Sequence, residues 1–290
     1  MPLIIALRKS VSRLSDNIPT FLRMLECCAT ETLQLTDVSM QPHIHQAVIL
    51  SAGFGKRVQH ISDTIPKVMA PIQGKPLLLH HIEWFKRHGV KEFFINLHYK
   101  PEAIRGYFGD GSSLGVSIRY ADEQPEILGT AGGVKQFEPF VNENFFMIYG
   151  DLYSEVNYSK MAEHFFAPGG PAENDAYGME LVGDTDHPQD SDLVEVDTHL
   201  KFIKIYPKPH EKLPTRYRSM RGVFILNKKI LSVIPPATYY EMDHQVLPAL
   251  VAGGKPFYGY EAPEDFVKDI GTPERYYQVH AHLEGQSLVL

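Results

Sequence analysis

A glycine-rich segment with two basic side chains is the part of the sequence best suited to chemistry on phosphates. It reads Ser51-Ala52-Gly53-Phe54-Gly55-Lys56-Arg57, and Pro66-Lys67 follows it. Glycines let the backbone bend sharply and bring its N–H groups close to a ligand. Arg57 and Lys67 add fixed positive charge beside that loop. The segment therefore predicts a site for a polyphosphate.

Two common glycine motifs do not fit this segment. The dinucleotide-binding fingerprint requires a third glycine where this chain has Val58. A Walker A loop requires a glycine five positions before the glycine of its Gly-Lys pair, and Leu50 occupies that position. An ordinary strand-to-helix turn with incidental Arg and Lys is the alternative to a phosphate site.

Two aspartates far apart in the sequence are candidate ligands for a metal ion. Asp151 follows the apolar run Phe145 to Tyr149 and one glycine, and Asp269 lies in a second motif near the C-terminus. A carboxylate at the carboxyl end of a central strand faces the crevice of an open α/β sheet. Its hard oxygen atoms are the ligands that Mg²⁺ prefers. Taken alone, Asp151 is equally well explained as a turn residue.

Apolar runs bounded by glycines and prolines predict the elements that position these residues. Strands are expected over 47–50, 92–97, 116–120 and 145–149, with helices over 76–88 and 101–108 between them. Alternating strands and helices indicate an α/β domain with parallel pairing and right-handed crossovers. Gly129 to Gly133 precedes a further expected helix, and its three glycines leave room for a flat ligand. A flexible loop is the alternative there.

Length and composition exclude several functional classes. With 290 residues, of which 43% are hydrophobic, the chain forms one large α/β domain or a domain with a small appendage. A net charge of −7 argues against broad nucleic-acid binding, and no apolar run is long enough to span a membrane. The adjacent Cys27 and Cys28 exclude a disulfide framework and favour the cytoplasm. The histidines show no zinc-ligand spacing.

Three of these segments together resemble the signature of the sugar-1-phosphate nucleotidyltransferases. They are Leu50-x-Ala52-Gly53-x-Gly55-x-Arg57 with Pro66-Lys67, then Leu128-Gly129-Thr130-Ala131-Gly132, and finally Asp269-Ile270-Gly271-Thr272-Pro273-Glu274-Arg275. The resemblance covers residues 46 to about 280. It implies an α/β, Rossmann-like three-layer fold with a mixed, mostly parallel central sheet. Residues 46–290 are then the nucleotidyltransferase domain, and residues 1–45 are an extension, either an addition upstream of Met40 or a packed helix.

The resemblance also implies a reaction and roles for individual residues. The reaction is sugar 1-phosphate + NTP → NDP-sugar + pyrophosphate. Arg57 and Lys67 would be catalytic, and Asp151 and Asp269 would hold Mg²⁺. Lys208 and Gly222 would bind the sugar phosphate. The residues expected to bind the nucleotide are Leu50, Ala52, Gly53, Gly55, Lys56, Gly129 and Thr130.

The sugar-facing half departs from the common pattern of that family. Many relatives have Glu-Lys-Pro where this chain has Pro207-Lys208-Pro209, so recognition of the sugar hydroxyls must come from elsewhere. The run from His187 to Glu195, together with Lys208-Pro209-His210, resembles the mannose- or heptose-1-phosphate guanylyltransferases, and GTP is therefore the expected nucleotide. Glu241 and Asp243 lie where relatives have an acidic pair of unclear role. For Glu241 a solvated surface position is an equal alternative.

Two other functions stay open at this point. One is a uridylyl- or thymidylyltransferase that acts on another sugar 1-phosphate. The other is a regulatory subunit that binds a nucleotide sugar without making it. The catalytic set Arg57, Lys67, Asp151, Lys208 and Asp269 is present, which favours an enzyme. The sequence does not fix the assembly state, and a homo-oligomer is one option.

Overall fold

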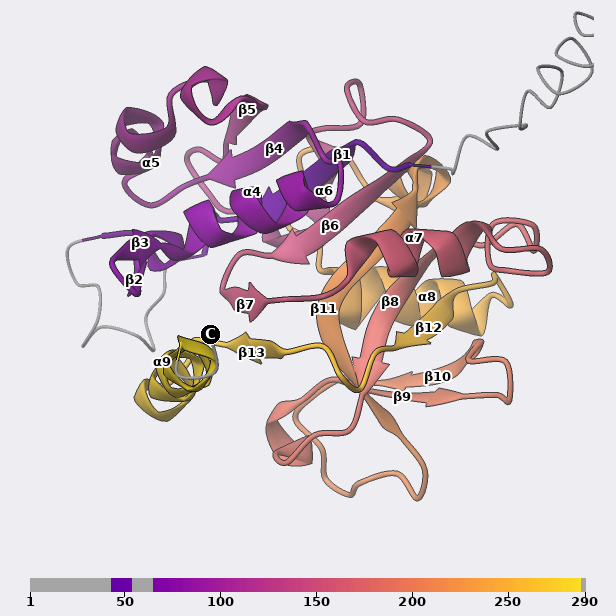
Figure 1. Ribbon diagram of the computed structural model, residues 1–290. Coiled ribbons are helices and arrows are strands. Elements are labelled where there is room, and N and C mark those ends of the chain that lie inside the picture. Colours follow the sequence, from indigo (N-terminus) through magenta and orange to yellow (C-terminus); the bar gives the residue numbers. More distant parts are fainter. Residues whose placement is uncertain (1–42, 54–64, 288–290) are drawn as a thin grey trace, which may run out of the picture. The chain divides into compact units, whose positions relative to one another are not determined.

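The computed structural model describes residues 43–53 and 65–287 (Figure 1). Residues 1–42, and with them most of the predicted extension, lie outside the described residues, as do Gly55, Lys56 and Arg57. The strands are β1 (Gln46–Leu50), β2 (Pro71–Ile72), β3 (Lys75–Pro76), β4 (Glu92–Leu97), β5 (Ser117–Asp122), β6 (Asn144–Tyr149), β7 (Leu152–Ser154), β8 (Gly178–Gly183), β9 (Leu193–Val196), β10 (Phe202–Tyr206), β11 (Arg218–Asn227), β12 (Tyr258–Glu261) and β13 (Val267–Asp269). The α-helices are α4 (Leu77–Arg87), α5 (Pro101–Phe108), α6 (Gly129–Lys135), α7 (Tyr158–Phe166), α8 (Leu247–Ala252) and α9 (Pro273–Ser287).

The central sheet is mixed and mostly parallel, as the sequence predicted. Its path runs β10-β9-β11-β6-β1-β4-β5, with β8 also paired to β11 and β12 paired to β8. The neighbours β6, β1, β4 and β5 are parallel to one another. Of the nine strands in this described sheet, all but β10 and β11 run in the same direction.

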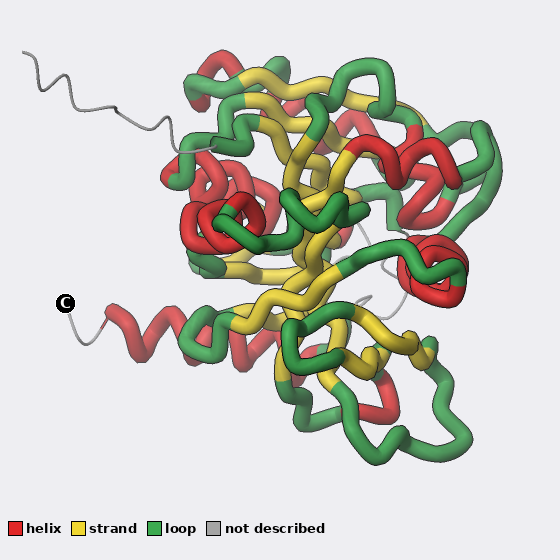
Figure 2. The backbone as a smooth tube through the Cα atoms, turned by 90° about the vertical axis from the view of Figure 1, so that its right-hand side faces the viewer, coloured by secondary structure: helices red, strands yellow, loops and turns green. Residues whose placement is uncertain are grey.

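The central strands β1 and β6 are mostly apolar because the sheet is covered on both faces. In β1, Ala47 and Ile49 pack into one core cluster and Val48 packs into another. Helices α4, α5 and α7 contribute to the first cluster, and α6 and α8 contribute to the second. Figure 2 shows the strands in the middle with helices on either side. Two covered faces give the three-layer arrangement, and they explain why β1 reads as a continuous apolar run.

The glycine-rich segment at residues 129–133 differs from its prediction, because it lies inside α6 and not before a helix. The reason is close packing. A Cβ atom at Gly132 would lie 2.5 Å from the Thr238 carbonyl oxygen, and one at Gly133 would lie 2.6 Å from Asn96 Nδ2. The glycines therefore let a helix press against its neighbours, and the segment is not a loose loop.

A small ribbon outside the main sheet connects two distant parts of the chain. Strands β7 and β13 pair antiparallel, with Leu152 opposite Asp269. The Ile270 N–H also donates to the Asp151 carbonyl oxygen at 2.9 Å. The ribbon therefore brings Asp151 and Asp269 to one place, and Figure 1 shows β13 beside β7.

Within the described ranges, no helix is long and apolar enough to cross a membrane.

Candidate active site

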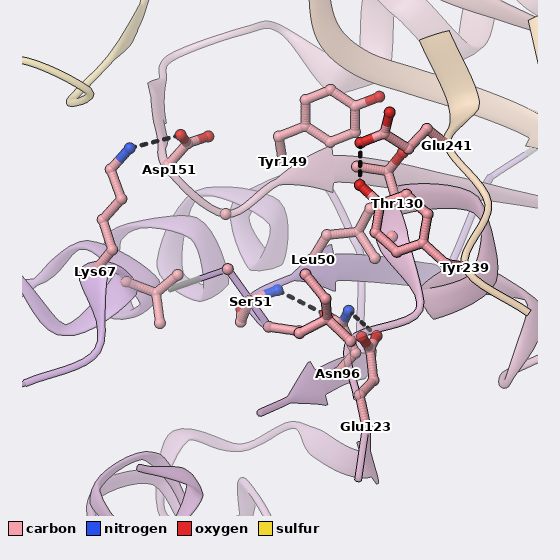
Figure 3. Close-up of a pocket in the computed structure, with 16 residues that line it drawn as sticks. Leu50, Ser51, Lys67, Asn96, Glu123, Thr130, Tyr149, Asp151, Tyr239 and Glu241 are labelled. Carbon is pink, nitrogen blue, oxygen red and sulfur yellow. Dashed lines mark hydrogen bonds and ion pairs between the residues drawn. The ribbon is translucent and has the colours of Figure 1, made fainter. Parts of the chain in front are cut away.

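Two cavities open near the carboxyl ends of β1 and β6. The first cavity, of about 380 Å³, is bounded by Leu50 to Gly53, Asn96, Glu123 and the start of α6 (Figure 3). The second cavity, of about 620 Å³, lies between β8, β11 and the β7–β13 ribbon. Tyr149 and Asp151 line both cavities. The two cavities therefore meet beside Asp151.

A buried hydrogen-bond chain ties together three strand ends at the first cavity. Asn96 Oδ1 accepts from the Ser51 N–H at 2.6 Å, and Asn96 Nδ2 donates to Glu123 Oε1 at 2.6 Å. Glu123 Oε2 accepts from the Leu128 N–H at 2.7 Å. Burial raises the pKa of Glu123, and the hydrogen bonds from Leu128 and Asn96 oppose that rise. The chain fixes the loop after β1 relative to α6.

The predicted nucleotide-binding residues that the structure describes all line the first cavity: Leu50, Ala52, Gly53, Gly129 and Thr130. Gly129 has a φ of +72°, and a Cβ there would lie 2.6 Å from the Tyr240 carbonyl oxygen. Thr130 Oγ1 accepts from the Met242 N–H at 2.8 Å. On the same wall, the Tyr239 hydroxyl donates to Glu241 Oε1 at 2.7 Å. Glu241 is thus a cavity-lining residue, and not only a surface one.

The two predicted metal ligands each carry a basic partner. Lys67 Nζ lies 2.7 Å from Asp151 Oδ2, and the Lys67 side chain is only 11% exposed. Arg275 Nη1 donates to both carboxylate oxygens of Asp269, at 3.0 and 3.1 Å. Arg275 Nη2 also donates to Asp190 at 3.1 Å. The site therefore alternates carboxylates and cations, an arrangement suited to phosphate groups with a metal ion.

A magnesium ion fits this donor set when a nucleotide completes its coordination. Within the described residues, no three His, Cys, Asp or Glu side chains converge to hold a metal by themselves. Mg²⁺ is commonly held by one or two carboxylates together with water and substrate phosphates. Asp151 and Asp269 supply that number of carboxylates from the two strands of the ribbon.

Lys208 and Gly222, the predicted sugar-phosphate residues, both line the second cavity. Asp192 contacts Lys208 at two points. Asp192 Oδ1 accepts a hydrogen bond from the Lys208 backbone N–H at 2.9 Å, and Asp192 Oδ2 lies 3.2 Å from Lys208 Nζ. Gly222 has a φ of +69°, and a Cβ there would lie 2.6 Å from the Tyr149 ring. Gly222 therefore allows β11 to pass directly against Tyr149.

Two buried acids at the second cavity were not assigned to a site from the sequence. Glu180 is fully buried in β8, and its pKa is raised well above the ordinary value by burial and by the nearby charge of Asp243. Burial also raises the pKa of Asp243, and the charge of Asp192 adds to that effect. The Tyr149 hydroxyl donates to Asp243 Oδ2 at 2.7 Å. The available signal was a single acidic residue, Glu180, inside the otherwise apolar run of β8.

Comparison with known proteins places these features in a family. A model described as nucleotidyl transferase matches residues 46–286. The chain belongs to this family. Within it, the chain is a sugar-1-phosphate nucleotidyltransferase homologue, which confirms the resemblance of its motifs. Members of the family typically use a divalent metal ion.

The relatives of this nucleotidyltransferase differ in nucleotide and sugar. It is 31% identical over 248 residues to the UTP–glucose-1-phosphate uridylyltransferase of Synechocystis, covering 80% of this chain and 62% of that protein. It is 30% identical over 236 residues to the D-glycero-alpha-D-manno-heptose 1-phosphate guanylyltransferase of Campylobacter jejuni, covering 80% and 97%. The chain thus spans less than two thirds of the first relative and almost all of the second.

A solved structure supports the fold. HddC from Yersinia pseudotuberculosis, in complex with GMP-PN, has a TM-score of 0.67 and 25% sequence identity to this chain. The likeness covers 83% of this chain and 100% of HddC. The α/β fold predicted from the sequence is therefore confirmed. The similar identities of the uridylyl and guanylyl relatives leave the nucleotide and sugar to be argued from the site.

Proposed function

We propose that this chain transfers a guanylyl group from GTP to a mannose- or heptose-type 1-phosphate, with release of pyrophosphate. One observation supports the proposal most strongly: two cavities, one lined by the predicted nucleotide-binding residues and one by Lys208, share the wall formed by Tyr149 and Asp151. An arrangement of this kind lets two anionic substrates meet at a single point.

The proposed reaction is an in-line substitution. A phosphate oxygen of the sugar 1-phosphate forms a bond to the α-phosphorus of GTP, and the bond between the α-phosphorus and the bridging oxygen of pyrophosphate breaks. A sugar phosphate has a second pKa of about 6, so its attacking oxygen is already largely ionised at neutral pH. The protein then has to align two anions and balance their charge.

The described residues divide these tasks between them. Lys208, held by Asp192, would anchor the sugar phosphate in the second cavity. Lys67 would balance charge on the nucleotide phosphates, since it lies at Asp151 where the cavities meet. Asp151 and Asp269 would hold Mg²⁺, which when bound neutralises charge on the α-phosphate. We also keep Arg57, with the backbone of Gly55 and Lys56, as the proposed triphosphate contact, although all three lie outside the described residues.

Two considerations favour GTP as the nucleotide. The Campylobacter relative, which this chain covers almost completely, is a guanylyltransferase. The first cavity also has the carboxylate of Glu241 on its wall, whereas both oxygens of Glu123 already accept hydrogen bonds. Guanine carries an amino group that donates hydrogen bonds, which carboxylates accept. UTP with glucose 1-phosphate is the second candidate, because of the Synechocystis relative.

We place the reaction in the cytoplasm and leave homo-oligomer formation as a separate question.

The test is a substrate matrix. The full chain is assayed for pyrophosphate release with GTP, UTP, dTTP, CTP and ATP against mannose, heptose, glucose and N-acetylated 1-phosphates in the presence of Mg²⁺. We expect GTP with a mannose- or heptose-type acceptor to give the highest kcat/KM. A clear preference for UTP or dTTP would overturn the guanylyl assignment. Absence of pyrophosphate release with every pair, while nucleotide sugars bind, would instead indicate the regulatory-subunit alternative.

A further inference from the structure

Two buried carboxylate oxygens at the second cavity have no hydrogen-bond partner among the described residues. They are Glu180 Oε2 and Asp243 Oδ1, and both residues line that cavity. The other oxygen of each carboxylate is engaged. Glu180 Oε1 accepts from the Gly222 N–H at 3.0 Å, and Asp243 Oδ2 accepts from the Tyr149 hydroxyl at 2.7 Å. Each side chain is thus fixed at one oxygen, and its second oxygen is buried in the wall of the cavity.

A buried polar atom without a partner lowers the stability of the fold. Such groups are uncommon in native proteins, and each calls for an explanation such as a functional role or a bound partner. Two of them at one cavity, each held by a hydrogen bond through its other oxygen, form a prepared acceptor pair.

We propose that Glu180 Oε2 and Asp243 Oδ1 accept hydrogen bonds from hydroxyl groups of the sugar ring and thereby decide which sugar 1-phosphate is accepted. The proposal rests on the function proposed above, because it places the sugar in the second cavity. It assigns a substrate class: a sugar with free hydroxyls at the ring positions that face this pair. A sugar that is deoxygenated or acylated at such a position would leave the carboxylates without a partner.

The surroundings of the pair agree with this assignment. Lys208 lies on the wall of the same cavity, so a phosphate bound there places the attached ring within the cavity. The residue before Lys208 is Pro207, which has no side-chain hydrogen-bonding group of its own. Burial raises the pKa of both acids, which favours a carboxyl that keeps its proton. A protonated carboxyl both donates and accepts, as a sugar hydroxyl does.

Amide substitutions test the pair with little change in shape. Glu180→Gln keeps an oxygen for the Gly222 N–H, and Asp243→Asn keeps one for the Tyr149 hydroxyl. Each change replaces only the oxygen without a partner by an NH₂ group. The measurement is kcat/KM for the preferred sugar 1-phosphate and for its monodeoxy analogues, together with calorimetric binding of the same sugar 1-phosphates to the full chain.

We expect the wild-type chain to discriminate against at least one monodeoxy analogue by tenfold or more. In Glu180→Gln or Asp243→Asn this discrimination should fall to about threefold or less for that analogue alone, with KM for the nucleotide within twofold of wild type. Thermal unfolding should show both variants close to wild type in stability, because each amide keeps the shape of the acid and the hydrogen bond at its other oxygen. The control is Glu83→Gln, which neutralises a surface carboxylate on α4 that pairs with Lys75 at 2.9 Å. It should preserve the discrimination.

The proposal is overturned if both variants keep the wild-type discrimination, or if they lose affinity equally for every analogue. Failure of the proposed function would look different, because the wild-type chain would then release no pyrophosphate with any acceptor. In that case, calorimetry still tests whether Glu180 and Asp243 bind the sugar, independently of catalysis. Binding of a sugar 1-phosphate that depends on the Glu180 and Asp243 oxygens supports the proposal without catalysis, and no binding by the wild-type chain refutes it.

Discussion

Lys67 and Arg275 occupy positions on the two carboxylates that a metal ion would use. Lys67 Nζ lies 2.7 Å from Asp151, and Arg275 Nη1 lies 3.0 and 3.1 Å from the two oxygens of Asp269. If the proposed site holds Mg²⁺, cation and metal would compete for the same oxygens. The nucleotide phosphates would then offer Lys67 and Arg275 new anionic partners. The ion pairs thus keep the carboxylates in place and can be exchanged at low cost.

We expect Asp151→Asn and Asp269→Asn each to lower kcat on the order of 100-fold, since each removes charge from the proposed Mg²⁺ site. The measurement is pyrophosphate release as a function of Mg²⁺ concentration. Thermal unfolding is the control, and it should change little for Asp151→Asn because that side chain is 38% exposed and its ion pair contributes about 1 kcal/mol or less. An Asp269→Asn chain with unchanged activity and unchanged Mg²⁺ dependence would refute the two-carboxylate site.

Lys208→Ala should separate sugar-phosphate binding from nucleotide binding. Loss of one charge-assisted phosphate contact weakens binding by roughly 1.5–3 kcal/mol, so KM for the sugar 1-phosphate should rise about tenfold to a hundredfold. KM for the nucleotide should change little. The matched control is Lys204→Ala, which removes an exposed lysine that lies over the Tyr206 ring in β10. A Lys208→Ala chain that weakened the nucleotide alone would show that this lysine has been assigned to the wrong substrate.

At the scale of elements, α6 positions the first cavity by pressing on Asn96 and Glu123. A Cβ at Gly133 would lie 2.6 Å from Asn96 Nδ2 and 2.7 Å from Glu123 Oε1. These are the two atoms that share the 2.6 Å hydrogen bond of the buried chain. One packed unit is therefore formed by α6, the strand ends and the loop after β1. A methyl group added at Gly133 would push α6 away from Asn96 and Glu123.

Gly133→Ala tests this unit against a matched glycine. We expect it to destabilise the fold by about 1–3 kcal/mol through overpacking and to raise KM for the nucleotide. Gly106→Ala is the control, because Gly106 also lies in a helix, α5, and an added Cβ would meet nothing within 4 Å. Gly106→Ala should stabilise the fold by up to about 1 kcal/mol. Urea unfolding measures the stability of both variants. Equal changes in the free energy of unfolding for the two substitutions would contradict the packing argument.

The sequence predicted the parallel half of the sheet well because buried strands and their helices have clear patterns. It also grouped Asp151 with Asp269, and the structure brings both residues to the wall of one cavity. Their role as metal ligands stays a prediction. It did not predict the roles of Asn96, Glu123 and Glu180. Asn96 and Glu180 are single polar residues inside apolar strands, and Glu123 follows the polar end of β5. The contacts of all three depend on which strands are neighbours. Strand order and the contacts across it arise from tertiary packing, which local patterns do not encode.

At the scale of the whole molecule, stability should depend on pH through a buried histidine. His81 in α4 is 2% exposed, and burial lowers its pKa to about 4. The unfolded chain binds a proton at this residue below about pH 6.5, whereas the folded chain does not until about pH 4. Stability from the neutral His81 is therefore present above pH 6.5 and lost as pH falls toward 4, by roughly 3 kcal/mol.

His81→Gln isolates this contribution because it cannot titrate and still offers an N–H to the Gly150 carbonyl oxygen, which lies 3.4 Å from His81 Nε2. Other acids also titrate in this range, so the difference between the two chains is the informative quantity. We expect the free energy of unfolding to fall less steeply between pH 7 and pH 4 in the variant. Parallel curves for the two chains would mean that folding does not lower the pKa of His81.

We further expect residues 1–45 to be an extension outside the nucleotidyltransferase domain, because the family match begins at residue 46. A chain that starts at Met40 should fold and retain the activity of the full chain. Solubility, thermal unfolding and pyrophosphate release compare the two. If the shortened chain is insoluble or inactive while the full chain works, the first 39 residues contribute to the core of the enzyme.

The β7–β13 ribbon has a consequence for the time at which the enzyme becomes active during its synthesis. Asp151 and Asp269 are joined by pairing between strands that the ribosome produces far apart, with Leu152 opposite Asp269. The described walls of the first cavity end at Glu241, so they emerge earlier than β13. A nascent chain that stops before β13 could hold a nucleotide but would lack half of the proposed metal site. The order of translation would then delay activity, because the growing polypeptide could not consume nucleotide until β13, the last described strand, is added.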